Sequence, residues 1–168
     1  PIEPKSEFPN FQTVTTIRFY KDEETKGIVS KTIKLNTVDE VDYDAVFYPG
    51  GHGPLWDLAE DKDSILLIES FIKNNKPVGA VCHAPAIFKH TKNEEGTPLV
   101  KGRTVTGFSN TEEEAVQLTD VVPFLVENML KENGAIFSKG DDWAPYVLED
   151  ELLITGQNPA SSELVAEI

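Results

Sequence analysis

Short apolar runs that end in glycine or a tight turn alternate along this chain with longer segments of helical period, and this alternation limits the folds it can adopt. Residues 45–48, 78–81 and 152–154 are apolar runs whose length is typical of buried strands. Residues 64–74 repeat apolar side chains every three or four positions, which predicts an amphipathic helix. Alternating strands and helices predict an α/β fold, a sandwich of helices around a mainly parallel sheet.

Capping residues predict where further helices begin. Asp63 is expected to cap the helix over residues 64–74, and Asp120 is expected to cap a later helix. Residues 14–35 give conflicting signals, because β-branched side chains are followed by a polar stretch that tolerates helix. We expect a helix there.

Size and charge exclude several classes of protein. The chain has 168 residues, a length typical of one domain, and we expect a single domain over residues 1–168. With 15 basic and 29 acidic residues, its formal net charge is −14 at pH 7. Such a surface repels a phosphate backbone or an anionic bilayer, which argues against binding to nucleic acid or membranes. The single cysteine cannot form an internal disulfide, so we expect a reducing compartment and a cytoplasmic location.

Cys82 is the strongest candidate for chemistry because of its position, where a buried strand turns into a helix. Turns of this kind present a nucleophile at the edge of a sheet. A thiol at a helix N-terminus is also expected to have a lowered pKa. The glycine-rich loop at 49–53 ends the preceding strand, and its backbone N–H groups are suited to complete an oxyanion hole. The local pattern leaves a buried structural cysteine as the alternative.

Histidines and acidic residues near the cysteine are the possible partners. His83 follows Cys82 directly, and an imidazole beside a thiol is a common activating base. The acidic run at 112–114 can orient that histidine, although carboxylates in the first turn of a helix are favoured without any catalytic role. For His52 and His90 we expect no chemical role. The spacing of the three histidines, without a cysteine pair, argues against a metal site.

Four motifs occur in order along the chain: AVFYPGGHGPLWDL at 45–58, AVCHAPA at 80–86, VTGFSN at 105–110 and ITGQNPAS at 154–161. Together they resemble the DJ/PfpI superfamily, which is class I glutamine amidotransferase-like. Within it they resemble the branch of heat-shock chaperones and glutathione-independent glyoxalases, the glyoxalase III type. The resemblance covers most of the chain, from about Pro4 to the end. The resemblance implies a flavodoxin-like three-layer sandwich that forms a homodimer and uses no cofactor and no metal.

The resemblance also implies roles for individual residues. Cys82 is the implied nucleophile, His83 the implied base, and Glu113 the implied acid of a catalytic triad. The backbone N–H groups of Gly51 and His83 are the implied oxyanion hole. Ala84 stands where some members carry Gly, and its methyl group is expected to narrow the pocket.

Family members carry a strand, a helix and a second strand before the stretch that matches Pro4, and a glutamate in that segment hydrogen-bonds the nucleophilic thiol. This chain has no such segment, and its last helix stops early at Ile168. We therefore expect a domain that is truncated at its N-terminus and trimmed at its C-terminus.

The implied function is the conversion of methylglyoxal, or of a related 2-oxoaldehyde, to a 2-hydroxy acid such as lactate through a hemithioacetal on Cys82. The same branch implies deglycase activity and a holdase chaperone activity toward unfolded client proteins. Two alternatives stay open. A cysteine amidase or peptidase would use the same nucleophile, base and oxyanion hole, and a non-enzymatic holdase or redox sensor would use the exposed surface or an oxidisable thiol.

Overall fold

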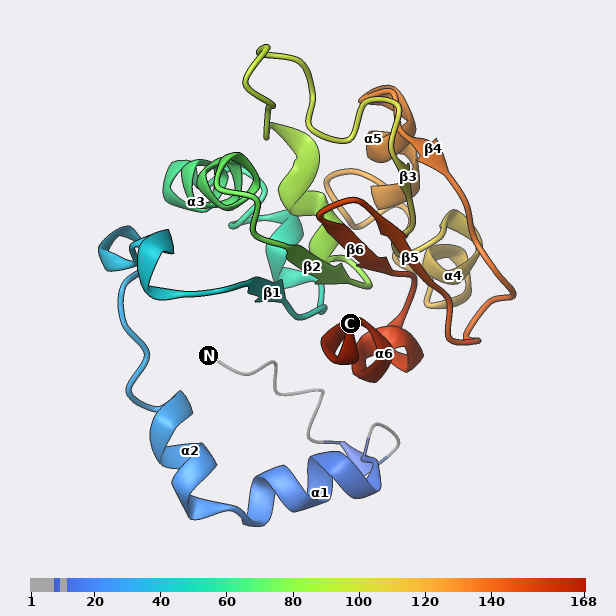
Figure 1. Ribbon diagram of the computed structural model, residues 1–168. Coiled ribbons are helices and arrows are strands. Elements are labelled where there is room, and N and C mark those ends of the chain that lie inside the picture. The colour runs from blue at the N-terminus through green and yellow to red at the C-terminus, as the bar shows by residue number, and fades with distance from the viewer. Residues whose placement is uncertain (1–7, 10–11) are drawn as a thin grey trace. The chain divides into compact units, whose positions relative to one another are not determined.

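A computed structural model describes residues 8–9 and 12–168 of the chain (Figure 1). The chain divides into two compact units, residues 1–37 and residues 38–168. The candidate site lies entirely in the second unit. The expected single domain over residues 1–168 stays a prediction.

The first unit holds two short helices, α1 (Val14–Lys21) and α2 (Glu23–Val29). Thr13 caps α1 through a capping box, and the Asp22 side chain accepts hydrogen bonds from the first backbone N–H groups of α2. These caps satisfy N–H groups that a helix start leaves without partners, so helix prevails over the strand preference of the β-branched residues. The helix expected over residues 14–35 is thus present up to Val29, in two pieces.

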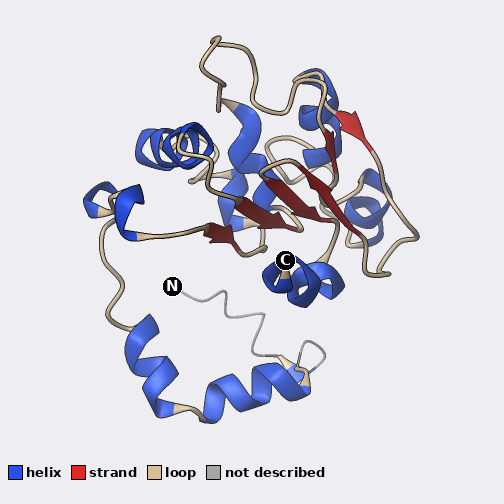
Figure 2. Cartoon of the chain, viewed as in Figure 1, coloured by secondary structure: helices blue, strands red, loops and turns tan. Residues whose placement is uncertain are grey.

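A four-stranded sheet forms the centre of the second unit (Figure 2). Its order is β1-β2-β6-β5, with β1 parallel to β2, β2 parallel to β6, and β5 antiparallel to β6. The bounds are β1 Val46–Tyr48, β2 Val78–Val81, β5 Val147–Asp150 and β6 Leu153–Gly156. A second, parallel pair joins β3 (Thr104–Val105) to β4 (Ile136–Phe137). The predicted α/β fold with a mainly parallel sheet is therefore confirmed.

Burial differs between the strands. All residues of β2 and β6 are buried, as expected for strands with neighbours on both sides and helices over their faces. In β1, by contrast, Phe47 is 41% exposed. Among the described residues β1 pairs with β2 alone, and of residues 45–48 only Tyr48 is buried, so the expectation of a fully buried strand there was wrong for the other three.

Helices cover both faces of the sheet. In Figure 1, α3 and α6 lie on opposite sides of it, and both contact β2. The α-helices of this unit are α3 Lys62–Lys73, α4 Asn110–Ala115, α5 Val126–Glu132 and α6 Ser162–Glu167. The 3₁₀ helices are η4 Glu40–Asp42, η5 Gly53–Leu55, η6 Ala84–Lys89 and η7 Pro159–Ser161, and η3 Leu35–Thr37 belongs to the first unit.

Two predicted helix starts were wrong. Asp61, and not Asp63, caps α3, because its carboxylate accepts the backbone N–H of Ser64 at 2.8 Å. The later helix begins at Val126 and does not follow an Asp120 cap. Pro123 explains the difference, since a proline disfavours helical geometry at the residue before it.

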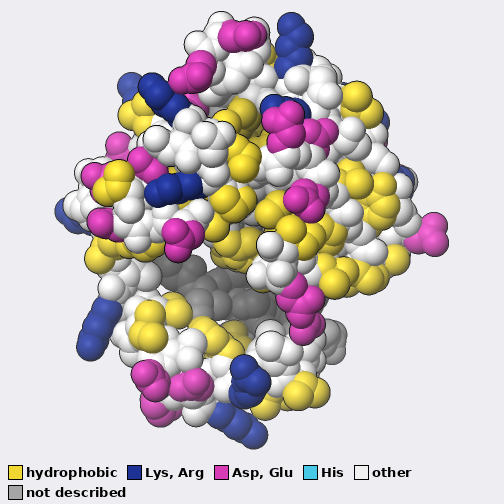
Figure 3. Space-filling model, viewed as in Figure 1, with side chains coloured by type: hydrophobic (Ala, Val, Ile, Leu, Met, Phe, Trp, Pro, Cys, Tyr) yellow, Lys and Arg dark blue, Asp and Glu magenta, His cyan; other side chains and the backbone are white. Residues whose placement is uncertain are grey.

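The surface carries charges of both signs. Figure 3 shows acidic and basic side chains interspersed on the face in view. Among the described residues, every helix is too short or too polar to span a bilayer.

Gly156 has no room for a side chain, which gives a test of the packing between β6 and α6. A Cβ there would lie 2.7 Å from Val165 Cγ2, 2.8 Å from Ser161 Cβ and 2.9 Å from Val81 Cγ2. We expect Gly156→Ala to lower the free energy of unfolding by about 1–3 kcal/mol in urea denaturation, because of overpacking. Gly53→Ala is the control, since a Cβ at Gly53 meets nothing within 4 Å. Equal effects of the two variants would contradict the packing described.

Candidate active site

The nucleophile candidate occupies a strained turn between β2 and η6. Cys82 has a φ of 64°, in the left-handed region that side chains other than glycine seldom adopt. Two backbone hydrogen bonds hold it there: its N–H donates to the Gly156 carbonyl at 2.9 Å, and its carbonyl accepts the Phe108 N–H at 2.7 Å. The turn is therefore fixed by the core strand β6 and by the segment that leads into α4, as is typical of a strained turn that presents a nucleophile.

The loop that follows β1 contacts this turn closely. A Cβ on Gly50 would lie 2.6 Å from Cys82 Cβ and 3.3 Å from its Sγ, so only glycine fits there. Gly51, the next residue, has a φ of 94°. The backbone N–H groups of Gly51 and His83 both hydrogen-bond the sulfur. The two groups expected to form an oxyanion hole thus meet at Cys82.

A chain of hydrogen bonds links the thiol to a carboxylate. His83 Nδ1 lies 3.2 Å from Cys82 Sγ, and His83 Nε2 lies 2.7 Å from Glu113 Oε2. All three side chains are buried, with relative exposures of 5% for Cys82, 1% for His83 and 2% for Glu113. Because a carboxylate only accepts, His83 carries its proton on Nε2, which leaves the Nδ1 lone pair facing the sulfur.

Two aromatic rings pack against the His83 imidazole. His52 lies 3.9 Å away between ring centroids, and Phe108 lies 4.1 Å away. Trp143 in turn contacts the Phe108 ring edge-on at 5.8 Å. The His83 ring is therefore held by packing as well as by hydrogen bonds, which restricts its rotation.

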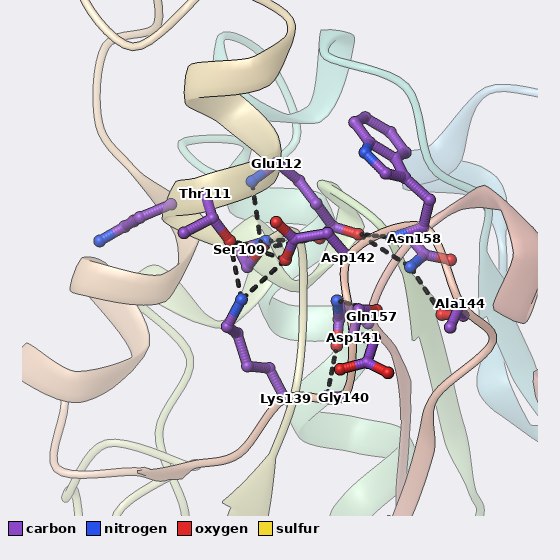
Figure 4. Close-up of polar contacts among 12 residues, drawn as sticks. Ser109, Thr111, Glu112, Lys139, Gly140, Asp141, Asp142, Ala144, Gln157 and Asn158 are labelled. Atoms are coloured by element: carbon purple, nitrogen blue, oxygen red, sulfur yellow. Dashed lines mark hydrogen bonds and ion pairs between the residues drawn. The ribbon is translucent and has the colours of Figure 1, made fainter.

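Glu112 anchors the helix that carries Glu113. One carboxylate oxygen accepts the N–H and O–H of Ser109, and the other accepts the Trp143 N–H at 2.9 Å and the Asn158 side-chain amide at 2.8 Å (Figure 4). Glu112 is fully buried, and these donors come from the α4 cap, the loop after β4 and the segment after β6. The carboxylate fixes how α4 is turned, and so points Glu113 at His83.

The pKa values of the base and the acid suit this arrangement. Burial lowers the pKa of His83 and outweighs the hydrogen bond that His83 donates to Glu113, so His83 is neutral at pH 7. Burial alone would raise the pKa of Glu113, but hydrogen bonds from His52 and His83 outweigh it and lower this pKa to about 2. A neutral base therefore lies between a thiol and an ionised carboxylate.

The thiol itself differs from the sequence expectation. Burial raises the pKa of Cys82 to about 12, although the Gly51 and His83 N–H groups act in the opposite direction. The expected lowering was wrong because the side chain is almost fully covered, and because a short 3₁₀ helix, η6, follows it in place of an α-helix. Cys82 is therefore a thiol at neutral pH, and His83 Nδ1 lies 3.2 Å from its sulfur, within reach of its proton.

The structure brings together Cys82, His83, Glu113 and the Gly51 N–H, the residues that the sequence pointed to. His90 lies apart and pairs with Glu60 at 3.0 Å. Sequence reasoning missed His52, whose Nε2 lies 3.1 Å from Glu113 Oε1. The one signal for His52 in the sequence was its place in the glycine-rich loop that follows the strand before the one leading to Cys82.

One group of side chains in the described part of the chain could hold a metal ion. His52, His83 and Glu113 each offer a ligand atom within 4.8 Å of the others. The Nε2 atoms of both histidines and both Glu113 oxygens already form the His83–Glu113 and His52–Glu113 hydrogen bonds. A bound ion would have to displace both bonds, so the arrangement fits a hydrogen-bonded acid–base site better than a metal centre.

The fold and the site define a class: α/β proteins that present a cysteine at a strand–helix turn, with an adjacent histidine and an acid. The model of the DJ-1/PfpI family matches residues 13–167, and the chain belongs to this family. The resemblance seen in the sequence motifs is thereby confirmed.

Named relatives point to one branch of the family. The chain is 31% identical over 140 residues to glyoxalase 3 of Candida albicans, with 80% of this chain and 59% of the relative aligned. It is 32% identical over 166 residues to the glutathione-independent glyoxalase HSP31 of Saccharomyces cerevisiae, with 95% and 70% aligned. The crystal structure of glyoxalase III from Candida albicans superposes with a TM-score of 0.91 at 27% identity, covering 99% of this chain and 73% of that one. The chain thus spans about three fifths to three quarters of these proteins.

The Glu112 network predicts a large loss of stability from a small chemical change. In Glu112→Gln an amide group would face backbone and side-chain donors in a buried place, and we expect the free energy of unfolding to fall by about 2–4 kcal/mol. Glu114→Gln, on an exposed neighbour in the same helix, should change it by less than about 0.5 kcal/mol. Urea denaturation measures both, and similar values for the two variants would contradict the anchoring role.

The raised pKa of Cys82 predicts an unusual pH profile for its alkylation. Only the thiolate reacts, and a pKa of about 12 keeps its fraction small at neutral pH. The rate with iodoacetamide should therefore still rise about tenfold per pH unit between about pH 8 and pH 10, where an ordinary thiol approaches its limit.

The urea-unfolded protein is the control, because its thiol has lost the burial that raises the pKa. Its rate should level off above about pH 9. A folded protein whose rate is already constant below about pH 8 would show that Cys82 rests as a thiolate.

Proposed function

We propose that this protein converts a 2-oxoaldehyde such as methylglyoxal to the corresponding 2-hydroxy acid, lactate, without glutathione. The observation that carries this proposal is the neutral His83 base, with one ring nitrogen 3.2 Å from the Cys82 sulfur and the other bonded to the ionised Glu113. A single base that can accept and return protons beside a nucleophile is what the reaction requires.

In the first step the thiol adds to the aldehyde. His83 Nδ1 takes the S–H proton, the sulfur forms a bond to the aldehyde carbon, and the carbonyl oxygen takes the negative charge. The N–H groups of Gly51 and His83, which already contact the sulfur, stabilise that oxygen. The oxygen then takes the proton back from His83, which gives a neutral hemithioacetal.

In the second step a proton moves between the two carbons. His83 removes the C–H proton from the former aldehyde carbon and passes it to the ketone oxygen, which gives an enediol. His83 then takes the O–H proton from the first carbon and delivers it to the second carbon, so the first carbon becomes the carbonyl of a thioester. The first carbon is oxidised and the second is reduced, so the step needs no external oxidant or reductant.

In the third step water releases the product. Water attacks the thioester carbon while His83 takes a proton from it. The C–S bond then breaks, and His83 returns the proton to the sulfur. Glu113 holds the imidazolium that forms in each step and keeps its Nδ1 directed at the sulfur. The thiol, the base and the acid all return to their starting states.

The named relatives support this choice of reaction over hydrolysis of an amide or ester. Two relatives with at least 31% identity carry the name glyoxalase, one of them glutathione-independent. Because the chain covers 59% and 70% of their lengths, the reaction is proposed here for this chain and not carried over from them. Homodimer formation and holdase activity stay predictions of the family resemblance.

The proposal predicts lactate formation from methylglyoxal in the absence of glutathione and in the presence of a chelator. Cys82→Ala should reduce the rate to that of buffer, because the hemithioacetal can no longer form. Glu113→Gln should lower kcat about 100-fold or more, since an amide cannot accept the His52 and His83 hydrogen bonds together and His83 loses its fixed tautomer.

Glu114→Gln, the exposed neighbour, is the matched control and should keep full activity. A folded protein that forms no lactate, or whose Cys82→Ala variant still forms it, would overturn the proposal. Hydrolysis of an activated ester with a burst of acyl-enzyme, without lactate formation, would assign the site to a cysteine hydrolase instead.

A further inference from the structure

A second histidine contacts the acid of the site. His52 ends the loop after β1, and its Nε2 lies 3.1 Å from Glu113 Oε1, the carboxylate oxygen that His83 does not use. Since the carboxylate is an acceptor, His52 donates this bond from Nε2–H. Both oxygens of Glu113 are therefore occupied by imidazole donors.

Two occupied oxygens fix a carboxylate in a way that one cannot. With the His83 bond alone, Glu113 could turn about its terminal torsion and offer either oxygen, in varied directions. The His52 bond ties the second oxygen to a loop in which Gly50 is packed against Cys82. It thereby sets the direction in which Oε2 meets His83 Nε2.

The contact also keeps Glu113 ionised. The hydrogen bond from His52 is the largest of the effects that lower the pKa of Glu113, ahead of the bond from His83. An ionised Glu113 accepts from His83 Nε2–H, and so keeps the Nδ1 lone pair free to take the thiol proton. A carboxyl that gained a proton would lose one acceptor and allow the other tautomer of His83.

We propose that His52 is a positioning residue, which acts on Cys82 through Glu113 and His83 by holding the carboxylate so that His83 stays in its Nε2–H tautomer. The ring packing of His52 against His83 at 3.9 Å adds to this restraint. As a contribution to turnover, this role rests on the proposed function, but its effect on His83 exists without substrate.

A double-mutant cycle on lactate formation tests the path of action. We expect His52→Leu to lower kcat about tenfold with KM changed less than about twofold, because no substrate contact is lost. His52→Gln, whose amide N–H can reach Glu113, should recover most of that loss. In the Glu113→Gln background, His52→Leu should change kcat by less than about twofold, because the residue it acts through is already impaired.

His90 provides a matched control for the substitutions. It forms the same kind of pair, with Glu60 at 3.0 Å, but lies apart from the site. His90→Leu and His90→Gln should leave kcat unchanged. If the losses of kcat from His52→Leu and Glu113→Gln multiply in the double variant, His52 acts on the substrate directly and the positioning role is overturned.

A measurement without substrate separates this inference from the proposed function. The chain has three histidines, so ¹⁵N spectra of labelled imidazoles can be assigned with the His90→Gln and His52→Leu variants. We expect His83 to show a protonated Nε2 and an unprotonated Nδ1, and to move toward averaged values in His52→Leu but not in His52→Gln. If the His83 signals are unchanged in His52→Leu, the positioning role of His52 is overturned even if lactate forms. If the His83 signals shift but the protein forms no lactate, the positioning role is supported and only the proposed function is rejected.

Discussion

The hydrogen bond between His83 Nε2 and Glu113 Oε2, 2.7 Å long and buried, is the contact on which the chemistry of this site depends. It decides which nitrogen of His83 carries the proton, and so leaves Nδ1 free to face the Cys82 sulfur. Burial makes the bond effective, because a low local dielectric strengthens a charge-assisted contact. The same burial raises the pKa of the Cys82 thiol and lowers that of the His83 imidazole, so both groups are neutral at pH 7.

The fold holds this bond from two directions. The short helix α4 delivers Glu113, and Glu112 beside it fixes the helix by accepting four hydrogen bonds from three separate segments. The turn at Cys82 delivers His83, and β6 together with the Phe108 N–H holds that turn in its left-handed conformation. Adjacent glutamates thus have different surroundings: Glu112 anchors the helix, while Glu113 bonds the two histidines and is the proposed acid of the site.

The sequence predicts part of the fold and part of the site, and the remaining parts depend on contacts between distant residues. The strand at 78–81 and the turn at Cys82 were predictable because a short, fully apolar run has few alternatives. β5 was not predicted because its sequence, VLED, is half acidic, and because no local pattern reveals which strand lies beside it in the sheet. Residues alone could not choose among three consecutive glutamates, since the choice depends on how α4 is turned; the family resemblance made that choice. The contact of His52 with Glu113 joins positions 61 residues apart, so only tertiary structure shows it.

The central claim is that a thiol activated by a neutral His83 attacks the substrate aldehyde. Rapid acid quenching during methylglyoxal turnover, followed by mass spectrometry of peptides, tests it most directly. The account predicts a mass increase of one methylglyoxal on the peptide that contains Cys82. This adduct should form and decay with rate constants at least as large as kcat, and it should accumulate less in Glu113→Gln. Turnover in which the Cys82 peptide stays unmodified, or is modified more slowly than product forms, would contradict it.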